Sequence, residues 1–210
     1  MSVLDEVALR RIVPVVVLDD AASAGPLAEA LVAGGLPIAE VTLRTAAALD
    51  AIAAMAARHD LLVGAGTVLT AEQVDQAVDA GARFVVSPGT SRAVVERARQ
   101  RGVAVLPGAV TATEIQAALE LGIDTVKFFP AGTSGGPAAI KALAAPFGGV
   151  RFVPTGGVSA TNLDDYLSIP SVLAVGGSWM VPQAAIREGD FDTVRRLTED
   201  AVAALGDRVA

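Results

Sequence analysis

The stretch Leu61-Leu62-Val63-Gly64-Ala65-Gly66-Thr67-Val68-Leu69-Thr70-Ala71-Glu72-Gln73-Val74 contains one complete structural unit. Its first six residues are apolar or glycine, which is typical of a strand buried on both faces. Thr70 is a good helix N-cap residue, and apolar and polar residues alternate with helical spacing after it. The stretch therefore predicts a short buried strand followed directly by an amphipathic helix.

The same strand–helix unit recurs along the chain. The strand candidates are residues 11–18, 38–43, 61–66, 84–88, 104–107, 125–129, 151–155 and 172–175. The helix candidates that follow them begin near Ala21, Ala46, Ala71, Ser91, Thr111, Pro137, Ala160 and Pro182. We also expect a small extra helix at residues 4–10 and a closing amphipathic helix at residues 193–205.

Eight such units predict an α/β protein folded as a (β/α)8 barrel, at the short end of the range for that fold. The competing fold is a doubly wound open sheet, which usually has fewer strands at this length and a glycine-rich first turn. Here the first strand ends in Leu18-Asp19-Asp20 without that turn. No linker or low-complexity tract interrupts the pattern, so we expect one domain covering residues 1–210.

Composition narrows the class of partner. Of the 210 residues, 52% are hydrophobic and only 4% aromatic, and the net charge is −7. Nucleic acids and anionic membrane surfaces attract basic patches, so neither is expected as a partner. The chain starts with a polar, acidic segment and has no apolar run of membrane-spanning length, which favours a cytoplasmic protein.

Metal and thiol chemistry have few candidate residues. The chain has no cysteine, which excludes disulfides, thiolate catalysis and iron–sulfur clusters, and it has one histidine, His59. His59 lies between a predicted helix and a predicted strand, where a solvated loop residue is expected. Metal-dependent hydrolases and aldolases usually gather several histidines, so we expect no metal site.

Lys127 breaks the apolar pattern of its strand, in Asp124-Thr125-Val126-Lys127-Phe128-Phe129-Pro130. A lysine inside a buried parallel strand is costly if it is charged and unpaired. Burial favours the neutral amine, which is a nucleophile for carbonyl carbons. The alternative is a lysine that pairs with a carboxylate for structural reasons only.

A second polar set occurs in Ile38-Ala39-Glu40-Val41-Thr42-Leu43-Arg44. Side chains alternate along a strand, so Glu40, Thr42 and Arg44 share a face that must point into the barrel and toward its mouth. A carboxylate near Lys127 could transfer protons, and an arginine above it could clamp a substrate carboxylate. A structural Glu–Arg pair is the alternative.

Glycine-rich turns follow several strands. Gly64-Ala65-Gly66-Thr67 ends one strand with a free hydroxyl, and Ser87-Pro88-Gly89 ends the next. Thr155-Gly156-Gly157-Val158 and Gly176-Gly177-Ser178-Trp179 follow the last two strands, where barrel enzymes commonly bind phosphate through backbone N–H groups. Ordinary turns are the alternative, and Trp179 is expected to pack against a neighbouring element.

With these motifs in order from about Arg11 to Pro182, the chain resembles the KDPG/KHG aldolases, which act on 2-keto-3-deoxy-6-phosphogluconate and 4-hydroxy-2-oxoglutarate. The motifs that carry the resemblance are Glu40-Val41-Thr42-Leu43-Arg44-Thr45, Gly64-Ala65-Gly66-Thr67-Val68, Lys127-Phe128-Phe129-Pro130-Ala131, Pro154-Thr155-Gly156-Gly157-Val158 and Gly176-Gly177-Ser178-Trp179. The family often has an acidic residue after Phe-Pro-Ala, whereas this chain has Gly132.

The resemblance implies a class I aldolase folded as a (β/α)8 barrel, usually trimeric and needing no metal or other cofactor. It implies that Lys127 forms a Schiff base and that Glu40 is the general acid and base. The implied substrate-binding residues are Arg44 and Thr67 at the pyruvyl carboxylate, Pro88 and Thr155 along the site, and Gly156, Gly157, Gly177 and Ser178 at the phosphate.

Several alternatives stay open at this point. The same chemistry could act on unphosphorylated 4-hydroxy-2-oxoglutarate or on the C4-epimeric phosphogalactonate substrate. A sugar-phosphate epimerase or isomerase also uses a phosphate-binding barrel, although the single histidine and the lysine of the sixth strand count against it. A barrel that only binds a metabolite is the non-enzymatic alternative.

Overall fold

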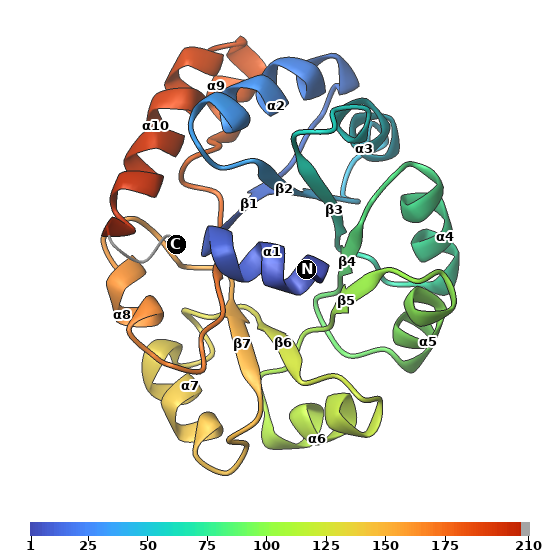
Figure 1. Cartoon of the computed structure of the whole chain (residues 1–210), viewed down its shortest axis with the longest axis vertical. Helices are drawn as coiled ribbons and strands as arrows, with labels where there is room; N and C mark the ends of the chain where they lie inside the picture. The colour runs from blue at the N-terminus through green and yellow to red at the C-terminus, as the bar shows by residue number, and fades with distance from the viewer. Residues whose placement is uncertain (207–210) are drawn as a thin grey trace.

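The computed structural model describes residues 1–206 and places a ring of parallel strands inside a layer of helices (Figure 1). Each strand is short, apolar and almost wholly buried, as expected for strands covered on both faces. The strands are β1 Ile12–Val16, β2 Ile38–Thr42, β3 Leu62–Gly66, β4 Phe84–Val86, β5 Ala104–Leu106, β6 Thr125–Phe128, β7 Arg151–Pro154 and β8 Val175–Gly177.

The strands close into a barrel. Six of them lie in the order β5-β4-β3-β2-β1-β8, and β6 pairs with β7, all in parallel. Single bridges complete the ring, because Gly108 after β5 pairs with Lys127 on β6, and Phe152 on β7 pairs with Val172 before β8. The predicted (β/α)8 barrel is confirmed, and the competing open sheet is wrong.

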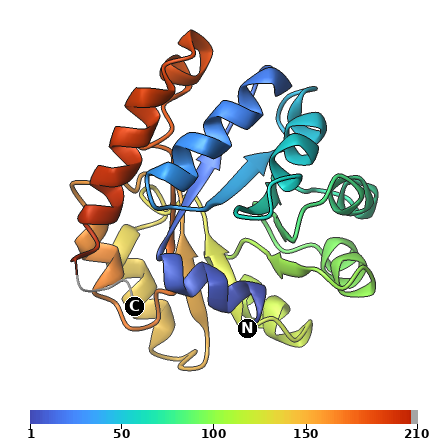
Figure 2. The same ribbon diagram turned by 45° about the horizontal axis from the view of Figure 1, so that its top comes forward.

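Helices surround the ring, and Figure 2 shows α2 and α10 side by side on its outer surface. The expected N-cap at Thr70 is present, since its hydroxyl accepts a hydrogen bond from Gln73 N at 3.1 Å. The helical elements are α1 Val3–Arg10, the 3-10 turn η1 Ala21–Ser23, α2 Ala24–Ala33, α3 Ala48–Ala56, α4 Ala71–Asp79, α5 Arg92–Gln100, α6 Ala112–Glu120, α7 Gly136–Ala144, α8 Leu163–Leu167, α9 Gln183–Glu188 and α10 Phe191–Ala203.

The last strand differs most from its expected position. Residues 172–175 were predicted, whereas β8 is Val175–Gly177. The apolar run at 172–174 hydrogen-bonds to β7, through Leu173 N to Phe152 O, and the chain then crosses to pair with β1 through Val175 N to Arg11 O. Residues 172–175 therefore hydrogen-bond first to β7 and then to the start of β1. The helix expected near Ala160 is α8, and it begins later, at Leu163. It follows a turn in which Ser159 N donates to Asn162 Oδ1.

Helix α1 covers the amino-terminal opening of the barrel, as seen across the centre of Figure 1. Its residues Leu4 and Val7 line a narrow gap of about 10 Å³ inside the ring, together with apolar side chains from β1, β4, β5 and β7. A space this small is at the lower limit for one water molecule and has almost no polar lining. This part of the barrel has room for one water molecule at most, and the ionisable side chain that lines the gap is that of Glu40 on β2.

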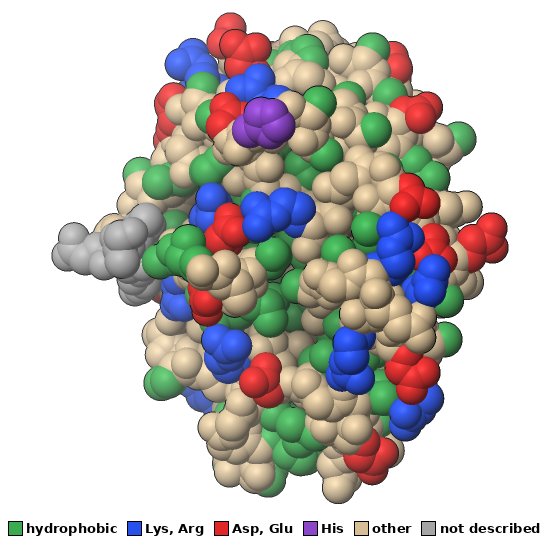
Figure 3. Space-filling model, turned by 45° about the vertical axis from the view of Figure 1, so that its right-hand side comes forward, with side chains coloured by type: hydrophobic (Ala, Val, Ile, Leu, Met, Phe, Trp, Pro, Cys, Tyr) green, Lys and Arg blue, Asp and Glu red, His purple; other side chains and the backbone are tan. Residues whose placement is uncertain are grey.

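The surface carries Lys and Arg side chains interspersed with Asp and Glu (Figure 3). The single histidine, His59, is exposed there, as predicted for a loop residue. Within residues 1–206, no helix combines the length and the apolar character needed to cross a membrane.

Gly64→Ala should lower the free energy of unfolding by about 1–3 kcal/mol, as overpacking of a core does. A Cβ added at Gly64 on β3 would overlap the ring of Phe84 on β4, which is buried in the barrel. Urea denaturation followed by circular dichroism measures the change. Gly25→Ala on α2 is the matched control, because a Cβ there meets nothing within 4 Å and should leave stability unchanged or slightly raised. Equal stability of both variants would contradict the packing.

Candidate active site

A buried ion pair lies at the centre of the barrel mouth. Lys127 Nζ on β6 donates to Glu40 Oε1 on β2 at 3.0 Å. The two residues are only 5% and 3% exposed, and they are 87 positions apart in the chain. Each charge is costly to bury alone, and the contact offsets much of that cost for both. The expected placement of Glu40 within reach of Lys127 is thus present.

Glycine on the neighbouring strand makes room for the carboxylate. Gly66 of β3 lies beside Thr42 of β2 in the parallel register. A Cβ at Gly66 would overlap the side-chain carboxyl of Glu40. The glycine that ends this strand therefore serves the Glu40 side chain and not only the turn, since any larger residue would push the carboxylate away from Lys127.

Phe129 is a site residue that the sequence reasoning missed. Its ring lies under the amine of Lys127, with 5.2 Å between Nζ and the ring centroid. The spacing in the sequence indicates this placement, because side chains two positions apart on a strand share a face and Phe129 is two positions after Lys127. Phe128 between them points the other way and meets Phe152 edge-on at 6.3 Å between centroids.

Arg44 and Thr67 meet above the ion pair. Arg44 Nε donates to Thr67 Oγ1 at 3.2 Å, which joins the loops after β2 and β3. Thr67 has a φ of 59°, a left-handed backbone conformation that is uncommon for a β-branched residue. Such strain persists only where the surroundings impose it, and it often marks a functional position. The guanidinium retains donors for an anion beside the Thr67 hydroxyl.

Hydroxyl groups tie the other loops of the mouth together. Thr42 Oγ1 donates to Val16 O at 3.0 Å, which joins β2 to β1. Ser87 Oγ donates to Val68 O, directly after the strained Thr67. Pro88 follows Ser87 and is exposed at the rim. These bonds hold the rim residues at fixed positions around the ion pair.

The loop after β7 presents two consecutive glycines in left-handed conformation, Gly156 at φ 87° and Gly157 at φ 80°. Thr155, 5% exposed, bridges Gly176 on the neighbouring β8. The loop after β6 is bonded to this one through Gly132 N to Gly156 O at 2.9 Å. Successive backbone N–H groups in a turn of this kind can form a concave site for an anion.

The side chain of Trp179, two residues further along the chain, explains why position 177 at the end of β8 is glycine. A Cβ at Gly177 would overlap the six-membered ring of Trp179, which is partly buried against the core. The expected packing role of Trp179 is thus present, and it requires glycine at position 177. Ser178 between them is exposed to solvent at the mouth.

The structure brings all the residues singled out above to one end of the barrel. Lys127 contacts Glu40, Arg44 contacts Thr67, and the Phe129 ring lies 3.3 Å from where a Cβ of Gly156 would be. Around the mouth, these contacts connect β2 with β3, β2 with β6, and β6 with β7. Within residues 1–206, no group of three or more His, Asp or Glu side chains is close enough to hold a metal ion.

Comparison with known proteins agrees with this arrangement. The model of the KDPG and KHG aldolase family matches residues 3–197. A 2-dehydro-3-deoxy-phosphogluconate aldolase of Treponema pallidum is 52% identical over 93% of this chain and 94% of its own length. The KHG/KDPG aldolase of Escherichia coli K12 is 45% identical over 91% and 90%.

This chain belongs to the KDPG and KHG aldolase family. Solved structures of this aldolase family share its fold closely. The 2-keto-3-deoxy-6-phosphogluconate aldolase of Zymomonas mobilis ZM4, crystallised with 3-phosphoglycerate, has a TM-score of 0.92, with 45% identity and 99% of each chain covered. The KDPG aldolase of Legionella pneumophila, with pyruvate captured at low pH as a covalent carbinolamine intermediate, has a TM-score of 0.89, with 40% identity over 93% and 95%.

The ion pair predicts non-additive stability effects in this aldolase. Lys127→Met should lower the free energy of unfolding by about 3–5 kcal/mol, because Glu40 then lies buried without its partner. Adding Glu40→Met should restore most of that loss, since two apolar side chains replace two charges. Urea denaturation of the wild type, both single variants and the double variant measures the coupling. Additive losses would mean that the two side chains do not depend on each other.

Proposed function

We propose that this aldolase reversibly cleaves 2-keto-3-deoxy-6-phosphogluconate to pyruvate and glyceraldehyde 3-phosphate through a Schiff base on Lys127. The observation that carries the proposal is the buried contact of 3.0 Å between Lys127 Nζ and Glu40 Oε1 at the barrel mouth. It places a nucleophilic nitrogen and a proton acceptor within transfer distance, away from bulk water.

The first half of the reaction forms the carbon–nitrogen bond. The ammonium of Lys127 gives a proton to Glu40, and the neutral amine attacks the C2 ketone to give a carbinolamine. Glu40 returns a proton to the departing hydroxyl, which leaves as water. The product is a cationic iminium beside a carboxylate, so the site again contains one positive and one negative charge.

The second half breaks the C3–C4 bond. Glu40, through a water molecule, takes the proton of the C4 hydroxyl, and the bonding electrons move into the iminium to give a neutral enamine. Glyceraldehyde 3-phosphate leaves with a new aldehyde group. Protonation of the enamine at C3 and hydrolysis of the iminium then release pyruvate and free Lys127. The iminium supplies the electron sink, and no metal or other cofactor enters these steps.

The remaining residues are proposed to hold the two ends of the substrate. Arg44 and the Thr67 hydroxyl, 3.2 Å apart, would bind the pyruvyl carboxylate. Pro88 and Thr155 would line the chain between the ends. At the far end, a phosphate would accept hydrogen bonds from the loops after β7 and β8, through Gly156, Gly157, Gly177 and Ser178.

Several finer assignments belong to the same proposal. One barrel domain would span residues 1–210, and the enzyme would work as a cytoplasmic homotrimer in the Entner–Doudoroff route, with no nucleic acid or membrane partner. The second candidate substrate is 4-hydroxy-2-oxoglutarate, because the Escherichia coli relative is named for both reactions. The C4-epimeric phosphogalactonate substrate is a third. Initial cleavage rates on all three compounds would rank them.

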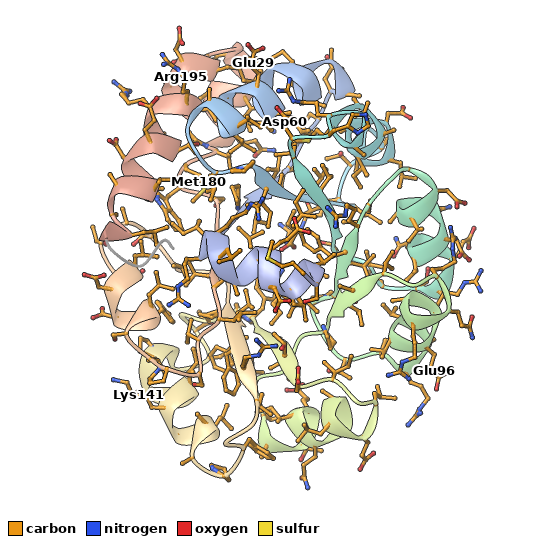
Figure 4. All side chains as sticks on the ribbon, viewed as in Figure 1. Glu29, Asp60, Glu96, Lys141, Met180 and Arg195 are labelled. Atoms are coloured by element: carbon orange, nitrogen blue, oxygen red, sulfur yellow. The ribbon has the colours of Figure 1, made fainter. Side chains whose placement is uncertain are left out.

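Pyruvate with a borohydride reductant should add one reduced pyruvyl group to each chain, on Lys127. The only other lysine is Lys141, which points outward from α7 (Figure 4) and is exposed to solvent. An imine formed on this exposed amine would be open to bulk water, which hydrolyses it. Intact mass followed by peptide mapping locates the label.

The control for this experiment is Lys127→Ala, which should take up no label. Labelling of Lys141, or no labelling of a protein that cleaves the substrate, would overturn the mechanism. A metabolite-binding barrel without activity would likewise remain unlabelled and cleave nothing.

Ser178→Asp should raise KM for the phosphorylated substrate and affect 4-hydroxy-2-oxoglutarate much less. The new carboxylate would repel a phosphate at the exposed end of β8, and the smaller substrate has no phosphate there. Ser178→Asn is the matched neutral control, with nearly the same shape. Steady-state kinetics on both substrates measures the difference; an equal rise in KM for both would place the phosphate elsewhere.

A further inference from the structure

The ring of Phe129 is the second group, after the Glu40 carboxylate, that faces the nitrogen of Lys127. The nitrogen lies over the ring at 5.2 Å from its centroid, and Glu40 lies at 3.0 Å. A cation within about 6 Å of an aromatic ring face is attracted by the ring quadrupole, and the attraction grows when water is excluded. Lys127 is 5% exposed, so this condition holds.

The ring also lies beside the loop after β7. A Cβ at Gly156 in that loop would come within 3.3 Å of two ring carbons of Phe129 and within 3.4 Å of the Pro130 backbone. Phe129 is therefore close both to the amine and to the loop that is proposed to bind phosphate, and glycine at position 156 leaves room for its ring.

We infer that Phe129 is a catalytic residue whose ring face stabilises the positive charge of the iminium on Lys127. The inference rests on the proposed Schiff-base function. It assigns to Phe129 an electrostatic part in the reaction, beyond filling space beside the lysine.

The charge on the nitrogen changes along the reaction in a way that separates this role from packing. Resting Lys127 is an ammonium paired with Glu40, and the amine that attacks the ketone and the carbinolamine that it forms are neutral. The iminium formed by loss of water is cationic, and the enamine formed by cleavage is neutral again. The ring therefore lowers the free energies of the ammonium and the iminium and has little electrostatic effect on the carbinolamine and the enamine. A ring that only fills space would affect all of these species alike.

The ring also differs from Glu40 in its dependence on protons. Glu40 stabilises the iminium only while it is ionised, and it gains a proton when it activates the C4 hydroxyl. The quadrupole of the ring has no protonation state. Phe129 therefore continues to stabilise positive charge on the nitrogen during the step in which Glu40 is being neutralised.

The test replaces Phe129 by 4-fluoro-, 3,5-difluoro- and 3,4,5-trifluorophenylalanine in the full chain. Fluorine withdraws charge from the ring face and changes the shape little. Deuterium exchange at the pyruvate methyl group reports passage from the cationic iminium to the neutral enamine. Its rate, divided by the amount of iminium trapped with borohydride, should rise at each step, because losing the charge becomes easier. The total rise expected for losing such an attraction is between about twofold and about thirtyfold.

A second readout separates charge from geometry. The equilibrium constant for the iminium with pyruvate, obtained from borohydride trapping across a pyruvate titration, should change little along the series, because the starting ammonium and the iminium carry the same charge beside the ring. A falling equilibrium constant or a falling normalised exchange rate would indicate a displaced ring or carboxylate and would contradict the inference.

The matched control is the same fluorinated series at Phe128, which is fully buried on the other face of β6 against Phe152. It should leave the normalised exchange rate unchanged. A normalised exchange rate that does not rise along the Phe129 series, with a wild type that traps pyruvate normally, would overturn the role of Phe129 and leave the proposed function intact. A wild type that traps no pyruvate would overturn both.

Discussion

The buried contact between Lys127 and Glu40 is the constraint on which the rest of this structure depends. Two opposite charges inside an apolar barrel are tolerated only if they meet, and they meet only if the ring is closed with β2 and β6 in their observed positions. Gly66 supplies the space for the carboxylate, and the narrow gap under α1, which Glu40 also lines, has room for one water molecule at most. The apolar surroundings that make the pair costly also keep bulk water away from the lysine nitrogen.

The loops of the barrel mouth are hydrogen-bonded to one another. The hydroxyls of Thr42 and Ser87 donate to carbonyl groups of neighbouring strand ends, and Arg44 reaches across to Thr67. Backbone bonds join the loop after β6 to the loop after β7. A site built this way holds its polar groups in place before substrate arrives, which is the condition for efficient electrostatic stabilisation.

The distribution of charge also fits an anionic substrate in an acidic protein. The chain has a net charge of −7, yet Arg44 and the glycine loops lie at the mouth. Local donors decide what binds at a site, because exposed surface charges more than a Debye length away are screened by salt. The Gly132 departure leaves the loop after β6 without a carboxylate next to Gly156, so no negative side chain is added at that edge of the site.

The sequence by itself determined the fold class and the two central residues. The eight apolar runs with helical segments between them predicted the barrel, because strand and helix periodicities are local properties. Lys127 and Glu40 stood out because charged residues are rare in buried strands. Only the tertiary structure decided the boundaries of β8, the crossing of residues 172–175 from β7 to β1, and the contact that requires glycine at position 66 beside the Glu40 carboxylate. Alternation along a strand gives the face of a side chain, whereas its neighbours across the barrel depend on strand stagger and closure, which no local pattern encodes.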